Sequence, residues 1–237
     1  MAGVFYLPAL KEGDTRATLE GDEAKHAAAV RRIRVGEEIT ITNGHGLLAT
    51  CEVTLVETRP PLVEASVQQV TAIPEPRSIH LAVAMPKGDR QRVLLEMATQ
   101  VGISEFTPLR CERSVSKESA NSQERWQRYC LEAMKQSRRA WLPHVNPGSG
   151  LESLIDSLPE DTVLVCASTE GGSIQGLGET ELDRGIAIVV GPEGGFTAEE
   201  LEAIRKKGAV ELSLGEGVLR TETAAVVTAA LLRLLAG

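Results

Sequence analysis

The chain has 237 residues, of which 42% are hydrophobic and 24% charged. This length fits one large domain or two of ordinary size, and the composition is that of ordinary globular proteins. Only 3% of the residues are aromatic, which disfavours a surface on which rows of Phe and Tyr stack bases. We find no signal-peptide pattern and no apolar run long enough to span a membrane, so we expect a cytoplasmic protein.

The net charge of −8 disfavours nucleic-acid binding at first sight, but the charge is uneven. Residues 147–237 hold 6 basic and 15 acidic residues, whereas residues 1–146 hold 19 and 18. Residues 110–144 carry 8 basic and 4 acidic residues. A second basic cluster comprises Lys25, Arg31, Arg32 and Arg34. Local patches of this kind bind phosphate even on acidic proteins, although charge alone equally fits solvated helix faces.

The four cysteines lie far apart, and none forms a Cys-x-x-Cys pair. Such spacing argues against a zinc site and against a disulfide framework. We therefore expect reduced thiols in the core or on the surface, and no metal. The four are Cys51, Cys111, Cys130 and Cys166.

Residues 1–71 are predicted to form a small β-rich domain. Residues 38–42 and much of 47–56 alternate in polarity, and Asn-Gly-His-Gly at 43–46 is a hairpin turn signal between them. Residues 62–70 are another strand candidate, and 26–34 fit one short helix. This is the pattern of a small barrel. Residues 72–77 contain two prolines and predict a stiff linker that ends the domain.

Strands and helices alternate after the linker, over residues 78–237. The expected strands are 78–85, 106–109, 162–167, 185–191 and 210–214, and the expected helices are 89–101, 121–138, 197–207 and 221–235. In the first helix, Val93, Met97 and Val101 recur at four-residue spacing. The second helix carries Trp126, Cys130, Met134 and Ser137 along one side, and the third opens with the capping box Thr197-Ala-Glu-Glu200. The alternation predicts a mostly parallel sheet covered by helices on both faces.

Two loops follow late strands of this sheet. One is Gly-Pro-Glu-Gly-Gly-Phe at 191–196, and the other is Gly-Glu-Gly-Val-Leu-Arg-Thr-Glu-Thr at 215–223. Ligands of open α/β sheets bind beyond the carboxyl ends of the strands. Neither loop has the lysine of a P-loop or a complete G-x-G-x-x-G fingerprint, and Met-Pro-Lys-Gly at 85–88 does not match the glycine loop of Rossmann methyltransferases. Two tight turns without a ligand remain the alternative.

The segments 188–200 and 214–224 closely resemble the SPOUT-class methyltransferases. More narrowly, they resemble the family that methylates N3 of a uridine in 16S ribosomal RNA of the small subunit. Residues 85–90, 111–115, 132–139 with Leu142-Pro143, and the N-terminal stretch 26–36 are similar to further motifs of that family. The resemblance covers essentially the whole chain. Two positions depart from the family pattern: Gln100 stands in place of Glu, and Gly217 in place of a basic residue.

The resemblance implies an α/β fold of two domains. A PUA-like RNA-binding β-barrel at 1–71 would precede a SPOUT methyltransferase domain at 78–237, which has a C-terminal trefoil knot at its cofactor site. It also implies a homodimer, S-adenosyl-L-methionine as cofactor, and ribosomal RNA or the small ribosomal subunit as partner. The implied cofactor-binding residues are Thr169, Gly191, Pro192, Glu193, Gly194, Leu214, Gly215, Val218 and Leu219.

Three residues are the catalytic candidates. Arg220 would orient the uracil and stabilise its enolate oxygen, and Glu222 would accept a hydrogen bond or the N3 proton. Arg139 would reach phosphate or uracil from the partner subunit. Each also fits a structural role: Arg220 pairing with Glu222, and the others as charges at helix ends. The RNA-binding candidates are Arg31, Arg32, Arg34, Arg113, Lys117, Arg125, Arg128 and Arg138.

Three other functions stay open at this point. A SPOUT enzyme that acts on tRNA or on a ribose 2′-hydroxyl would carry the same loops. A non-catalytic RNA-binding assembly factor would not bind the cofactor. A dinucleotide-dependent oxidoreductase would need a glycine fingerprint after an early strand, which this chain lacks.

Overall fold

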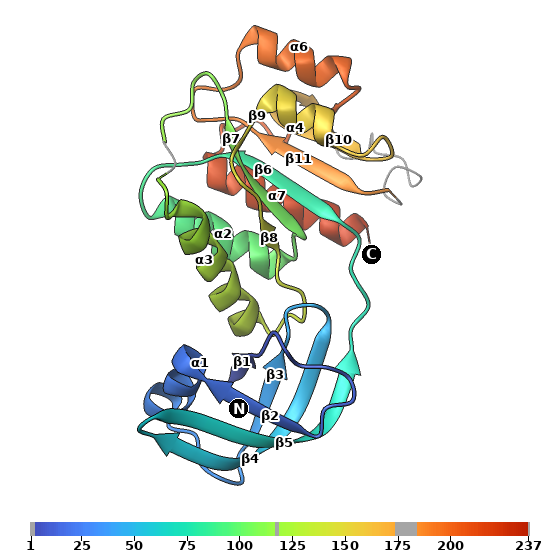
Figure 1. The fold of residues 1–237 in the computed structure, drawn as a ribbon. Helices are drawn as coiled ribbons and strands as arrows, with labels where there is room; N and C mark the ends of the chain where they lie inside the picture. The colour runs from blue at the N-terminus through green and yellow to red at the C-terminus, as the bar shows by residue number, and fades with distance from the viewer. Residues whose placement is uncertain (1–2, 117–118, 174–183, 237) are drawn as a thin grey trace. The chain divides into compact units, whose positions relative to one another are not determined.

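The computed structural model describes residues 3–116, 119–173 and 184–236 and folds into two compact units (Figure 1). The N-terminal unit comprises Met1–Glu75 together with Met134–Leu142. The α/β unit comprises Pro76–Ala133 together with Pro143–Gly237. The first crossing falls within the expected linker at 72–77, but the expected division leaves out the return segment Met134–Leu142. The sequence of this segment did not predict that it belongs to the N-terminal unit, because its first residues are the end of a helix that begins in the α/β unit.

The N-terminal unit is built on a five-stranded sheet in the order β1-β3-β4-β5-β2. The strands predicted at 38–42, 47–56 and 62–70 are present, the last two slightly longer than expected. Two further strands, of three and five residues, were not predicted. The strands are β1 (Val4–Tyr6), β2 (Arg16–Glu20), β3 (Glu38–Thr42), β4 (Leu47–Thr58) and β5 (Pro61–Ala72).

The helix predicted at 26–34 begins and ends earlier in the chain and is irregular. A short α1 (Gly21–Lys25) continues as a π-helix (His26–Arg31) and stops at Arg32, whose φ of 55° is left-handed. Ala24, Ala27 and Ala28 bury its inner side against the sheet. These small side chains let the helix lie close to the strands and leave the basic residues at its end exposed.

The turn between β3 and β4 holds the return segment in place. The turn itself is shaped by Asn43, whose side-chain oxygen accepts from the amides of His45 and Leu47 at 2.8 and 3.0 Å. The amide of Gly46 then donates to the carbonyl of Ala140 at 2.9 Å. The Trp141 indole covers Gly46 and donates to the carbonyl of Ile73 at 3.1 Å. The buried Lys135 adds an ion pair with Glu23 at 2.6 Å.

Replacement of Gly46 by Ala is expected to destabilise the N-terminal unit by about 2–4 kcal/mol. Gly46 has a φ of 92°, and an added Cβ would lie 2.6 Å from the Trp141 ring. Gly36 is the matched control, because its φ is 85° but nothing lies within 4 Å of an added Cβ. Gly36→Ala is expected to cost about 1–2 kcal/mol of backbone strain alone. Urea unfolding measures both, and equal losses would show that Trp141 is not packed on Gly46.

The α/β unit contains a seven-stranded sheet in the order β12-β10-β11-β6-β7-β8, with β9 paired to β7. Every pairing in it is parallel, as the alternation predicts. All five residues of β11 are buried, the mark of a strand covered on both faces. The strands are β6 (Ile79–Ala84), β7 (Glu105–Arg110), β8 (His144–Val145), β9 (Ser149–Gly150), β10 (Val163–Gly172), β11 (Ile186–Val190) and β12 (Val210–Leu212).

Helices cover both faces of this sheet (Figure 1). One face carries α2 (Arg90–Val101) and α7 (Thr221–Leu235), and the other carries α4 (Leu151–Ser157) and α6 (Ala198–Lys206). A further helix is α3 (Ser122–Ser137). The capping box at Thr197 is confirmed, since its hydroxyl accepts from the Glu200 amide and its amide donates to the Glu200 carboxylate. Within the described residues, no helix is both long and apolar enough to cross a membrane.

The predicted apolar side of α3 is correct, but that of α2 is wrong. Trp126, Cys130 and Met134 are buried along α3. In α2, Val93 and Met97 are 45% and 44% exposed. The buried residues are instead Leu94, Leu95, Ala98 and Thr99. Both sets of residues recur at helical spacing, so spacing alone does not show which set is buried. Packing of α2 against α7 buries the second set.

Candidate functional site

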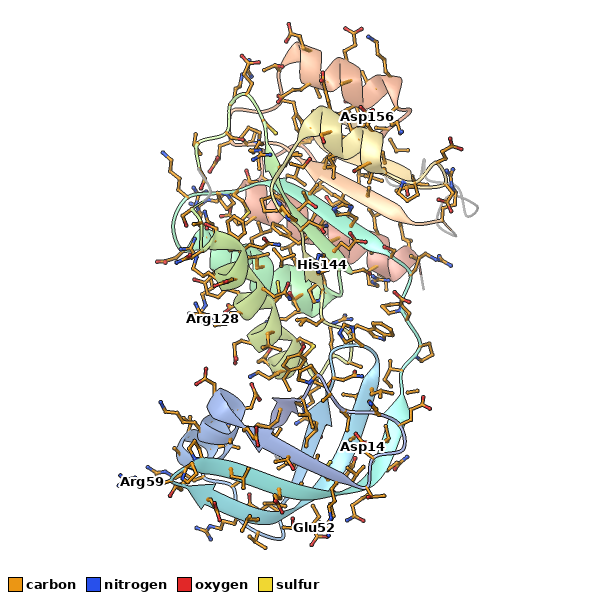
Figure 2. All side chains as sticks on the ribbon, viewed as in Figure 1. Asp14, Glu52, Arg59, Arg128, His144 and Asp156 are labelled. Carbon is orange, nitrogen blue, oxygen red and sulfur yellow. The ribbon has the colours of Figure 1, made fainter. Side chains whose placement is uncertain are left out.

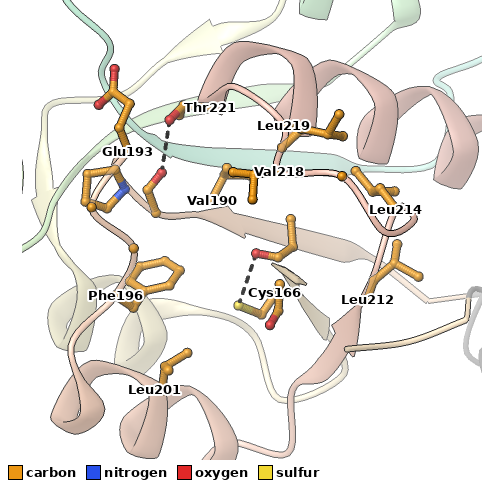
Figure 3. A pocket seen from close by; sticks show the side chains of 18 of the residues that line it. Cys166, Val190, Glu193, Phe196, Leu201, Leu212, Leu214, Val218, Leu219 and Thr221 are labelled. Carbon is orange, nitrogen blue, oxygen red and sulfur yellow. Dashed lines mark hydrogen bonds between the residues drawn. The ribbon is translucent and has the colours of Figure 1, made fainter. Parts of the chain in front are cut away.

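A cavity of about 400 Å³ opens at the carboxyl ends of β10, β11 and β12 (Figure 3). In the sheet, β10 lies between β11 and β12. The loops that follow β11 and β12 therefore flank the end of β10 and form two walls. These are the two loops that the sequence singles out. The cavity brings together eight predicted cofactor-binding residues: Gly191, Pro192, Glu193, Gly194, Leu214, Gly215, Val218 and Leu219.

Sequence reasoning missed the floor and one side of the cavity. Cys166, Ala167 and Ser168 contribute the floor from β10. Thr169, the remaining predicted contact, continues this strand, but its side chain lies outside the described residues. The other missed residues come from β11, β12, the two loops and the helices α6 and α7: Val190, Gly195, Phe196, Leu201, Leu212, Gly217, Thr221 and Ala224. Gly195, Phe196, Gly217 and Thr221 lie within the two loops that the sequence singled out but were not named as contacts, whereas the floor from β10 follows only from the strand order.

The two loops need glycine for different physical reasons. At Gly191 an added Cβ would lie 3.1 Å from the Phe196 ring, so any larger residue would require that ring to shift. Gly195 and Gly215 have φ values of 71° and 118°, which glycine adopts without strain. The Thr221 hydroxyl donates to the Gly191 carbonyl at 3.4 Å and so joins the start of α7 to the first loop (Figure 3).

The first loop is braced by the turn after β7. The Arg113 guanidinium donates to the Gly194 carbonyl at 2.8 Å. Glu200, the capping residue of α6, also accepts from the Glu112 amide at 2.9 Å. Arg113 was predicted to bind RNA, and the contact that the structure shows is with the loop. Its RNA role stays a prediction.

Arg220 and Glu222 lie at the start of α7, next to the second loop. Arg220 is the exposed N-cap residue, and its side chain does not cap the helix. Glu222 is mostly buried and faces Arg90, at 3.6 Å between the charged atoms. Arg90 also donates to Glu193 at 2.9 Å. The ion pair of Glu222 is therefore with Arg90, and the structural alternative of an Arg220–Glu222 pair is not the one that forms.

Two comparisons of sequence agree with this geometry. Residues 74–233 match the family model of the RNA methyltransferase domain, and residues 19–64 match that of the RNA methyltransferase PUA domain. The ribosomal RNA small subunit methyltransferase E of Mycobacterium bovis is 32% identical, over 96% of this chain and 89% of that protein. The chain belongs to this methyltransferase family. The Aquifex aeolicus member is also 32% identical, over 94% of this chain and 95% of its own length.

The solved structures include a member of the same family with a ligand. It is the ribosomal RNA small subunit methyltransferase E of Neisseria gonorrhoeae bound to S-adenosyl methionine. It is 28% identical to this chain, covers 99% of it and 98% of itself, and superposes with a TM-score of 0.90. Agreement over nearly all of both chains extends to the α/β fold as a whole.

The remaining predicted residues of this methyltransferase are spread over both units. Arg31, Arg32 and Arg34 are exposed on the N-terminal unit. Arg138 and Arg139 follow α3 in the return segment, and partial burial lowers the pKa of Arg139. In the α/β unit, Arg125 and Arg128 lie on α3, with Arg128 on its exposed side (Figure 2). Lys117 lies outside the described residues.

The cysteine nearest the chemistry is a poor nucleophile. Cys166 lines the cavity floor, and burial raises the pKa of its thiol to about 12, with Glu211 adding to the effect. Burial raises the pKa of Cys111 to about 12 as well, helped by Glu200. In the part of the chain that the structure describes, no three His, Cys, Asp or Glu side chains are grouped to hold a metal ion.

Iodoacetamide at pH 8 is expected to leave Cys166 and Cys111 unmodified in the native protein. A thiol with a pKa of about 12 is about one part in ten thousand thiolate at that pH. Mass spectrometry after a brief pulse, with a urea-unfolded sample as control, measures the labelling. Rapid native labelling of Cys166 would contradict the burial and pKa assigned to it.

Proposed function

We propose that the chain transfers a methyl group from S-adenosyl-L-methionine to N3 of a specific uridine in 16S ribosomal RNA. The observation that carries the proposal is the glycine-walled cavity at the ends of β10, β11 and β12. The Neisseria relative that shares this fold is bound to S-adenosyl methionine. The choice of a small-subunit ribosomal substrate is supported by the curated relatives, and that of uridine N3 by the resemblance of the loop motifs.

The residues of the cavity fit this cofactor. The space beside Gly215 and Gly217 is open, with no atom within 4 Å of an added Cβ, so ligand atoms can approach the backbone there. Val190, Leu212 and Leu219 give the cavity apolar walls. A pocket of apolar side chains with converging backbone polar groups suits a flat adenine ring with a polar edge. When bound, S-adenosyl-L-methionine supplies an activated methyl group.

The side chains of the protein must orient the uracil and accept its N3 proton. N3 of uracil carries a weakly acidic proton that must leave before the nitrogen attacks carbon. Arg220, exposed next to the cavity wall at Leu219, is suited to hold an oxygen of the base and stabilise its negative charge. Glu222 accepts a hydrogen bond or the proton, and Arg139 of a second subunit contacts the phosphate or the base.

The same proposal covers RNA binding. Arg31, Arg32 and Arg34 of the N-terminal unit form an exposed basic cluster suited to phosphate contacts. In the α/β unit, Arg113, Lys117, Arg125 and Arg128 contribute further positive charge, together with Arg138 of the return segment. Phosphate contacts position RNA without specifying it, so the target uridine must be presented unpaired.

We also propose a homodimer in the cytoplasm, where ribosomal subunits are assembled. The packed helices α2 and α7 leave apolar side chains exposed, among them Met97 at 44% and Leu234 at 79%. A second copy of the chain would cover them. The N-terminal sheet is proposed to close as a PUA-like barrel, and the chain through the cofactor loops is proposed to form a trefoil knot, as the family resemblance implies.

Incubation with labelled S-adenosyl-L-methionine tests the reaction directly. The substrates are small ribosomal subunits that lack the modification and, separately, bulk tRNA. We expect label in the ribosomal RNA as 3-methyluridine. Label in tRNA or on a ribose would overturn the substrate assignment and keep the methyltransferase. An absence of label together with an absence of cofactor binding would favour an assembly factor.

Replacement of Arg220 by Ala is expected to lower the rate of methyl transfer by roughly 100-fold, because the charge that develops on the uracil oxygen loses its partner. Cofactor affinity, measured by calorimetry, should change by less than about threefold, because the backbone of the loop is unchanged. Lys207→Ala, an exposed change in the same unit, is the control. Turnover near the wild-type rate in the Arg220 variant would remove it from the mechanism.

A further inference from the structure

Arg90, the first residue of α2, connects the two loops of the cavity through their carboxylates. It donates to Glu193 of the first loop at 2.9 Å and lies 3.6 Å from Glu222 at the start of α7. The side chains of Arg90, Glu193 and Glu222 are 34%, 37% and 12% exposed. The Arg90 guanidinium therefore contacts two carboxylates, the partly exposed one of Glu193 and the largely buried one of Glu222. Arg90 was within the family-like segment 85–90, but nothing in that segment indicates a role for it.

The backbone beneath Arg90 is held firmly. The next residue, Gln91, donates from its side chain to the Pro86 carbonyl at 2.9 Å. Its side-chain oxygen accepts from the indole of the buried Trp126 at 3.1 Å. Gly88 turns the chain with a φ of 65° immediately before the helix. Arg90 thus projects from a fixed point, which is what a side chain that positions others requires.

Glu222 depends on this guanidinium. Its Oε2 atom is buried and has no hydrogen-bond partner among the described residues. A buried carboxylate is stable only near a positive charge or hydrogen-bond donors. The 3.6 Å contact with Arg90 supplies the charge without a close hydrogen bond. The contact therefore fixes the place of Glu222 at the start of α7.

We propose that Arg90 is a positioning residue for the methyl transfer: it holds Glu222 beside Arg220 and, through Glu193, ties that arrangement to the cofactor loop. The inference rests on the proposed function, since it concerns how the same site is ordered. Arg90 acts through the two carboxylates and does not itself contact the reacting atoms. Its loss therefore lowers the rate of transfer more than the affinity for RNA.

Arg92 provides a matched control on the same helix. Its guanidinium pairs with Glu96 at 2.6 Å, in an i,i+4 ion pair within α2, and its side chain is 62% exposed. Loss of Arg92 removes the same charge and a comparable ion pair from the same helix. A role of Arg90 that was merely structural would make the two variants alike.

The experiment compares Arg90→Gln, Arg90→Lys, Arg92→Gln, Glu222→Gln and the double variant Arg90→Gln/Glu222→Gln. It measures single-turnover rate, KM for the RNA, S-adenosyl-L-methionine affinity and thermal unfolding. Arg90→Gln is expected to lower the rate roughly 10- to 100-fold, since small misplacements have effects of this size. KM and unfolding should resemble those of Arg92→Gln, and Arg90→Lys should recover part of the rate. At saturating cofactor, the double variant should be no slower than Glu222→Gln.

Three results would overturn the inference: an Arg90→Gln rate within about twofold of Arg92→Gln, a loss explained by unfolding, or multiplicative losses in the double variant. A wild-type protein that methylates another nucleotide would refute the proposed substrate, and the same comparison would then be made on that nucleotide. Cofactor affinity gives a separate test without RNA. Arg90→Gln and Glu193→Gln should each weaken it slightly, and the combination should add nothing; independent effects would refute the tie through Glu193.

Discussion

The site depends on the parallel pairing of β10 between β11 and β12. Val165 of β10 is aligned with Ile188 on one side and with Val210 on the other. Because parallel strands end at the same edge of a sheet, segments separated by tens of residues meet there. The loops after the outer two strands then face each other across the end of the middle one. Without this pairing the glycines would be ordinary turns, and the cavity would lose its floor and both walls.

Strand pairing brings the loops together, and side chains from other elements hold each loop in place. Arg113 holds the first loop from the turn after β7, and Thr221 holds it from α7. Glu200 fixes the start of α6 and the same turn after β7 at once. Arg90 joins both loops from α2. Since these supports come from different elements, the cavity is formed by the folded chain before any ligand binds, which reduces the ordering that binding requires.

Short-range sequence patterns predicted most of the helices and strands. The helix at 221–235, the strand at 38–42 and the capping box at Thr197 depend on neighbouring residues, and all three are present as predicted. The loops stand out because they follow strands and contain glycine, and eight of the contacts that the family resemblance implies line the cavity. Such features can be predicted from sequence because the residues that determine them lie within a few positions of one another.

The remaining features depend on contacts between distant residues. The buried side of α2 is decided by α7, and the return of residues 134–142 is decided by a turn that ends at Gly46. Arg90 and Glu193 lie 103 residues apart, so no spacing in the chain predicts their contact. The basic residues around Arg113 predict RNA binding, but its bond to the Gly194 carbonyl joins residues 81 positions apart, so the local pattern could not predict that contact.

A crystal structure of the chain with S-adenosyl-L-methionine tests the central claim most directly. The account predicts the cofactor in the cavity at the ends of β10, β11 and β12, against the backbone of Gly191, Leu214 and Leu219, with Arg90 still between Glu193 and Glu222. Cofactor bound elsewhere on the chain, or an empty cavity at saturating cofactor, would contradict it.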